Sequence, residues 1–170
     1  EYMSNLLELK NLKVDELMTH RNEILYLDLE DNFKNNLKAI NNSTFTRIPL
    51  IKNNFNNLIG VIDIRELLKD SSFNENADNS YLEKNSFQPV FIPQNKLAMK
   101  QLIDFKSQRE HMALVVDEYG EIQGLITLED IIEEIIGEIF DETDTDESYL
   151  EKIDDHNFLF NGNASIREIN

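Results

Sequence analysis

The clearest pattern of apolar and polar positions lies in residues 111–142. Two short apolar runs, 112–116 and 122–126, flank a turn-forming stretch at 117–121 that contains Gly120. Two such runs joined by a few residues with a glycine predict an antiparallel hairpin. From residue 128 the apolar spacing becomes that of one helical face, with acidic residues between, so we predict an amphipathic helix. Its apolar residues are Leu128, Ile131, Ile132, Ile135, Ile136 and Ile139.

The same order of elements occurs twice along the chain. Setting Gly60 on Gly124 aligns LIGVIDIRELL with IQGLITLEDII, and the apolar positions match one for one. Self-similarity of this length predicts two copies of one unit. Because a unit of about 55 residues buries little surface alone, we expect one pseudo-symmetric α+β body made of two tandem repeats. The expected strands are 24–27, 47–51, 58–62 and 87–92, and the expected helices are 33–40, 97–105 and one starting at 64.

Composition shifts divide the chain further. Pro49 predicts that the strand at 47–51 is an edge or terminal strand, and the Asn-rich residues 52–57 predict a loop. We assign residues 1–11 to the end of an upstream linker helix, 12–70 to the first repeat, 71–86 to a polar linker, 87–142 to the second repeat, 143–156 to an acidic linker, and 157–170 to the start of a further domain.

Charge narrows the range of partners. Sixteen basic and 33 acidic residues give a net charge of −17, which makes nucleic acid or an anionic membrane surface a poor partner. There is no cysteine, so thiolate chemistry and disulfides are excluded. No run of 18 apolar residues occurs, so the sequence predicts no membrane span.

Four stretches of the sequence resemble a known family: VDELMTHR at 14–21, TRIPLI at 46–51, LIGVIDIRELL at 58–68 and MALVVDEYGEIQGLITLEDIIEEIIGEIFDE at 112–142. They resemble a tandem CBS-domain pair (a Bateman module), most closely that of the HlyC/CorC family of hemolysin-like, magnesium and cobalt efflux proteins. The resemblance implies a cytoplasmic, homodimeric module of a parent protein at the inner or cell membrane, with an upstream transmembrane domain or a membrane transporter as partner. NFLFNGNASIREIN at 157–170 resembles the start of the transporter-associated domain that follows the pair in this family.

The junction between the strand at 122–126 and the helix from 128 has two interpretations. In the first, Thr127 caps the helix and Asp130 reaches back to complete a capping box, as Asp63 and Glu66 would in the first repeat. In the second, which the resemblance favours, Gly124, Thr127 and Asp130 bind an adenine nucleotide, AMP or ATP. By analogy with other pairs, the adenine would lie among Val90, Phe91, Ile92, Met112 and Ala113, with His111 at the border.

Phosphate groups in so acidic a chain need positive charge, which Arg21, Arg47 and Arg109 or a bound Mg²⁺ would supply. The first repeat departs from the family pattern, because His20 replaces a proline and Asp63 stands where serine or threonine is usual. The Asp63 carboxylate would repel phosphate, so we expect one working site.

Catalytic motifs do not occur in the sequence. His20, His111 and His156 lack zinc-site spacing, and the acidic stretch 141–148 lacks the glycine of a calcium loop. We therefore expect no enzyme and no metal site built from protein ligands alone. Two hypotheses remain: a nucleotide-binding regulatory module of a cation transporter, and a purely structural dimerisation module that uses the isoleucine-rich helix 128–139.

Overall fold

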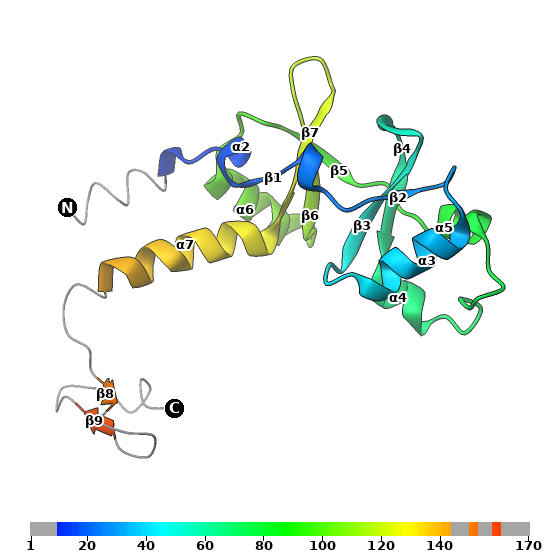
Figure 1. Ribbon diagram of the computed structural model, residues 1–170. Coiled ribbons are helices and arrows are strands. Elements are labelled where there is room, and N and C mark those ends of the chain that lie inside the picture. The colour runs from blue at the N-terminus through cyan, green and yellow to red at the C-terminus, as the bar shows by residue number, and fades with distance from the viewer. Residues whose placement is uncertain (1–9, 144–149, 153–157, 161–170) are drawn as a thin grey trace.

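The computed structural model describes residues 10–143, 150–152 and 158–160, and the side chains of residues 10–137. Two sheets stand at its centre with helices on their outer sides (Figure 1). One sheet has the strand order β2–β3–β4, and the other has the order β1–β7–β6–β5. The strands of the first sheet are β2 (Leu27–Asp28), β3 (Arg47–Lys52) and β4 (Asn54–Asp63); those of the second are β1 (Thr19–His20), β5 (Val90–Pro93), β6 (Met112–Val116) and β7 (Ile122–Thr127).

Helices cover the outer face of each sheet and bury a separate apolar cluster there. The first sheet carries α3 (Phe33–Asn42), α4 (Ile64–Lys69) and α5 (Asn79–Lys84). The second carries α2 (Val14–Leu17), α6 (Ala98–Gln108) and α7 (Leu128–Thr143). The 3₁₀ turn η1 (Arg21–Glu23) follows β1.

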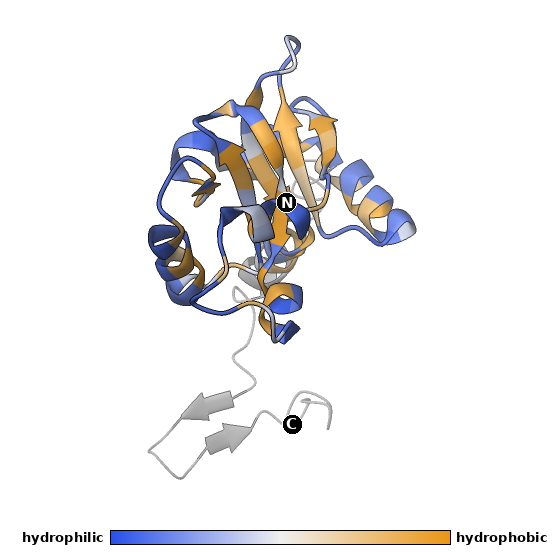
Figure 2. Ribbon diagram, turned by 90° about the vertical axis from the view of Figure 1, so that its right-hand side faces the viewer, coloured by the Kyte–Doolittle hydropathy of each residue, from blue (hydrophilic) through white to orange (hydrophobic). Residues whose placement is uncertain are grey.

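The inner faces of the two sheets meet in a third cluster, which joins the repeats. Alternation along β6 explains how: Ala113 and Val115 pack toward α6 and α7, while Met112 and Leu114 pack toward the other sheet. Both faces of β6 are buried, which is why its residues are apolar throughout. Figure 2 shows the strands largely orange, with much of the helix surface blue. The expected α+β body of two packed repeats is therefore confirmed.

Each sheet also pairs with a segment of the other repeat, through a strand in the second sheet and through an isolated bridge in the first. Strand β1 pairs with β7 of the second repeat, with Thr19 opposite Leu125 and His20 opposite Gly124. In the same way, Phe87 pairs with Val61 of the first repeat. The predicted linker 71–86 contains α5, whose Leu82 is fully buried in the cluster of the first repeat.

Three local predictions are wrong. The strand expected at 24–27 begins only at Leu27, where β2 starts. Strand β3 is central rather than an edge, but β2 reaches only Leu50 and Ile51, so the missing N–H of Pro49 leaves no gap in that pairing. The expected loop 52–57 is a tight turn at Asn53, with a φ of 77°, followed at once by β4. The hairpin and the helix from 128 are confirmed.

Farther along the chain, β9 (Phe158–Phe160) pairs with β8 (Leu150–Lys152). Most of the expected upstream helix, the acidic linker and the rest of 157–170 lie outside the described residues. In the part of the chain that the structure describes, no helix has the length and apolar character needed to cross a bilayer.

Candidate functional site

The start of α7 is held by a reciprocal cap. The backbone N–H of Thr127 donates to Asp130 Oδ2 at 2.9 Å, and the backbone N–H of Asp130 donates to Thr127 Oγ1 at 3.2 Å. This is the capping box expected from the sequence, a device worth about 1 kcal/mol. The cap leaves hydrogen-bonding groups available for a ligand, because the Thr127 hydroxyl can still donate its proton and the Asp130 carboxylate has a second oxygen that can accept. Capping and ligand binding are therefore compatible.

The equivalent start of α4 is built differently. Asp63 Oδ1 accepts hydrogen bonds from the backbone N–H groups of Arg65, at 2.9 Å, and Glu66, at 3.3 Å. The side chain of Glu66 pairs with Lys69 at 2.7 Å. The predicted hydrogen bond from the backbone N–H of Asp63 to the Glu66 side chain is therefore wrong. Asp63 alone caps this helix.

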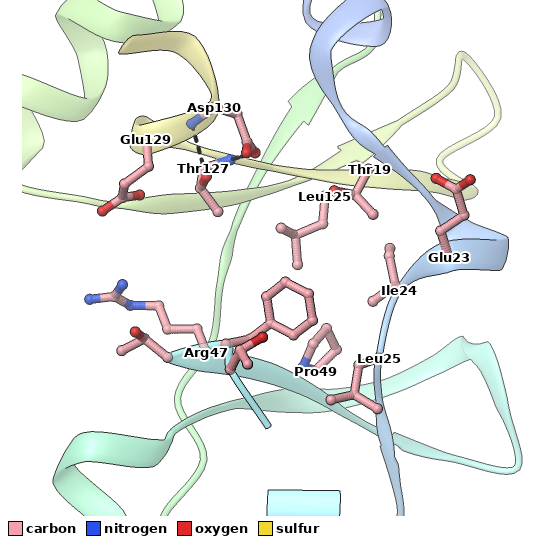
Figure 3. Close-up of a pocket in the computed structure, with 13 residues that line it drawn as sticks. Thr19, Glu23, Ile24, Leu25, Arg47, Pro49, Leu125, Thr127, Glu129 and Asp130 are labelled. Atoms are coloured by element: carbon pink, nitrogen blue, oxygen red, sulfur yellow. Dashed lines mark hydrogen bonds between the residues drawn. The ribbon is translucent and has the colours of Figure 1, made fainter. Parts of the chain in front are cut away.

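A cavity of about 310 Å³ lies where the two repeats meet, beside Thr127 and Asp130. This volume is at the lower end of the range for small-molecule sites. Figure 3 shows Thr127, Glu129 and Asp130 on one side and Arg47 and Pro49 on the opposite side. The lining residues are Thr19, Glu23, Ile24, Leu25, Thr44, Phe45, Thr46, Arg47, Pro49, Leu125, Thr127, Glu129 and Asp130.

Charge in the cavity is unevenly distributed. Arg47 is the one basic residue among the lining residues, against three carboxylates. Its Nη2 lies 3.6 Å from Asp63 Oδ2. Next to it, Arg65 Nη2 donates to Thr46 Oγ1 at 3.2 Å, so two residues of the first turn of α4 hold the wall formed by the start of β3. The described residues contain no group of three or more His, Cys, Asp or Glu arranged to hold a metal ion.

Of the predicted binding residues, Thr127, Asp130 and Arg47 line this cavity. The predicted adenine slot does not. Ile92 and Ala113 are buried in the cluster under α6 and α7, because strand alternation turns them to the face away from the other repeat. Val90 packs against that cluster, Met112 lies in the cluster between the sheets, and Phe91 lines a separate cavity.

Four further predicted residues lie elsewhere. An added Cβ at Gly124 would stand 2.5 Å from Met18 Sδ and 2.6 Å from the Thr19 carbonyl oxygen, so the missing side chain makes room for β1. His111 is half exposed, with Nδ1 3.9 Å from a Glu129 carboxylate oxygen. Arg109 ends α6 in a left-handed conformation, and Arg21 lies in η1; neither lines the cavity.

Sequence reasoning missed most of the wall contributed by the first repeat, above all Thr46 and the residues around Ile24. One available signal was the string TRIPLI, from which only Arg47 was assigned to the site. The apolar part of the cavity comes from Ile24, Leu25, Phe45, Pro49 and Leu125.

Two α/β repeats that exchange strands and enclose a cavity at their junction define a CBS-domain pair. The CBS-domain family model matches residues 14–72 and 88–137, and the chain belongs to this family. The curated relatives that it matches include hemolysin C and CorC proteins, so the resemblance found in the sequence is confirmed.

Among curated relatives, Hemolysin C of Brachyspira hyodysenteriae is 31% identical over 100% of this chain. The magnesium and cobalt efflux protein CorC of Pasteurella multocida is 32% identical, also over 100% of the chain. The chain spans only 62% and 56% of the length of these two relatives.

Two solved structures are similar in sequence and fold. One is a CBS-domain pair with bound AMP from Klebsiella pneumoniae, with 32% identity, a TM-score of 0.68, and coverage of 74% of this chain and 99% of that one. The other is the CBS domain of a bacterial CNNM/CorC family Mg²⁺ transporter in complex with ATP, with 32% identity, a TM-score of 0.67, and coverage of 81% and 96%.

Proposed function

We propose that this chain is the adenine-nucleotide-binding regulatory module of a longer divalent-cation efflux or hemolysin-like protein. One observation carries the proposal: Arg47 of the first repeat faces Thr127 and Asp130 of the second across a cavity of about 310 Å³. Similar CBS pairs with bound AMP and ATP support it. The module would work on the cytoplasmic side, next to the membrane part of its parent protein.

The cavity offers a partner for each part of such a ligand. The second oxygen of the Asp130 carboxylate would accept hydrogen bonds from the ribose hydroxyls. Arg47 would bind phosphate through its guanidinium, which matches phosphate oxygens in pairs. The adenine would lie against the apolar wall, formed by Ile24, Leu25, Phe45, Pro49 and Leu125.

Magnesium would assist a ligand with several phosphates. The cavity is lined by one arginine and by the carboxylates of Glu23, Glu129 and Asp130, so a triphosphate alone would meet repulsion. Mg²⁺ is commonly held by phosphate oxygens together with one or two carboxylates. We therefore expect ATP to bind more tightly with Mg²⁺ than without it.

Regulation would follow from the position of the cavity between the repeats. A ligand that contacts both walls favours the arrangement in which they stand at the right distance, and it shifts the population only by its difference in affinity for two arrangements. That shift would bias the attached transporter.

Thermal unfolding with AMP, ADP and ATP, each with and without Mg²⁺, tests the proposal. A ligand at a hundred times its dissociation constant adds about 2.7 kcal/mol to the stability of the folded state. Asp130→Asn should abolish most of this gain, because an amide oxygen can keep the cap while one carboxylate oxygen is lost. Asp78→Asn is the matched control, since Asp78 caps α5 and is absent from the cavity wall.

Two results would contradict the proposal: no stabilisation of the wild-type chain by any of the three nucleotides, or equal losses in the Asp130 and Asp78 variants.

A structural dimerisation module is the second candidate. It is favoured by Ile132 and Ile136, one helical turn apart on α7, which are 39% and 45% exposed although Ile131 beside them is fully buried. Homodimerisation is compatible with either function. A dimer in light scattering combined with no nucleotide-induced stabilisation would support the structural role alone.

A further inference from the structure

Asp63 links the first helix turn of one repeat to the candidate site. It is the direct cross-strand partner of Arg47 between β3 and β4, so the two side chains are neighbours on one sheet face. Its Oδ1 caps α4, and its Oδ2 lies 3.6 Å from Arg47 Nη2. One carboxylate thus serves the helix and the arginine at once.

Partial burial strengthens the electrostatic interaction between Arg47 and Asp63. The Arg47 and Asp63 side chains are only 25% and 20% exposed, so water screens them less than it screens a surface pair. Arg47 is also the sole basic group among the lining residues. A phosphate entering the cavity must therefore share this guanidinium with Asp63.

We propose that Asp63 is a built-in competitor for Arg47 that lowers the affinity of the cavity for the phosphate of its ligand. This role rests on the proposed nucleotide function. Asp63 would determine how strongly the phosphate group contributes to nucleotide binding. The Asp63 carboxylate interacts with the Arg47 guanidinium, which a phosphate in the cavity would also bind. Asp63 therefore weakens phosphate binding in the cavity beside the second repeat, and not at the start of its own helix. Its influence is confined to ligands that carry phosphate.

Asp63→Asn is the informative variant, because asparagine caps helices as well as aspartate does while the charge is removed. We expect the variant to bind AMP about fivefold more tightly, in line with the upper range for partly exposed ion pairs. Adenosine, which lacks the phosphate, should bind the variant and the wild-type chain equally. Calorimetric titration of the 170-residue chain measures both.

Glu66→Gln is the matched control. It removes the same charge from the same helix turn, but Glu66 pairs with Lys69, whereas Asp63 pairs with Arg47. AMP affinity should stay within about twofold of wild type, because exposed charges contribute little. A similar gain in both variants would mean that only the net charge acts, and would overturn the role of Asp63.

The remaining outcomes separate this inference from the proposed function. Wild-type protein that binds AMP while Asp63→Asn binds it equally or more weakly refutes the competitor role alone. A parallel gain for adenosine also refutes it, because the effect would not depend on phosphate. Wild-type protein that binds neither ligand refutes the nucleotide function and the role of Asp63 together.

Discussion

Gly124→Ala tests the pairing of β1 with the sheet of the second repeat. His20 of β1 pairs with β7 at this residue, and a Cβ here would lie 2.5 Å from Met18 Sδ and 2.6 Å from the Thr19 carbonyl oxygen. The methionine side chain can move aside. The carbonyl belongs to a paired strand, so relieving that contact requires β1 to shift away from β7.

The expected cost follows from this overlap. Inserting a methyl group into a packed site costs about 1–3 kcal/mol. For a chain of this size, each kcal/mol shifts the melting temperature by roughly 2–4 °C, so Gly124→Ala should lower it by about 2–12 °C. Adding Met18→Ala should restore only part of the loss, because the Thr19 carbonyl oxygen remains. Urea and thermal unfolding, followed by circular dichroism, measure both variants.

Gly137→Ala is the control for the substitution itself. Gly137 lies in α7 with open space where its Cβ would stand, so alanine should stabilise the helix by about 0.5–1 kcal/mol. If Gly124→Ala is as stable as the wild-type chain, residues 14–20 do not pack on β7 as described, and the pairing of β1 with β7 is refuted.

Two further predictions concern contacts outside the cavity. The Tyr81 hydroxyl donates to the Asp70 carboxylate, which raises the pKa of Tyr81 to about 12 and lowers the pKa of Asp70. The stability contributed by Asp70 is thus lost as the pH falls through its lowered pKa, and that of Tyr81 as the pH rises through about 12. Tyr81→Phe should return the Asp70 pKa toward its ordinary value in an NMR titration of the carboxyl group; an unchanged value contradicts the contact. Lys96 Nζ donates to Oε1 of Gln101, which is 2% exposed, at 2.6 Å. Lys96→Met should therefore cost about 1–3 kcal/mol in urea unfolding, and no loss would show that the buried amide has another partner.

Local signals in the sequence were sufficient for the second repeat. The hairpin and the helix depend on residues close in the chain and were predicted from spacing, and the cap between Thr127 and Asp130 was one of two interpretations of those residues. Helix α5 was missed because the polar stretch around it has few apolar residues; Leu82 becomes core only through the first repeat.

The candidate site was harder to predict because its walls come from distant segments. Arg47 was one of three arginines of equal standing until β3 and β4 placed it beside Asp63 and opposite Thr127. Ile92 and Ala113 were assigned to the ligand because a strand buried on both faces does not reveal which face meets the cavity.

A crystal structure of this chain with AMP tests the central claim most directly. We predict AMP in the cavity between the repeats, with its ribose on Asp130, its phosphate on Arg47 and its adenine against Ile24, Leu125 and their apolar neighbours. AMP bound elsewhere on the chain, or a cavity closed by its own side chains with AMP excluded, would contradict the account.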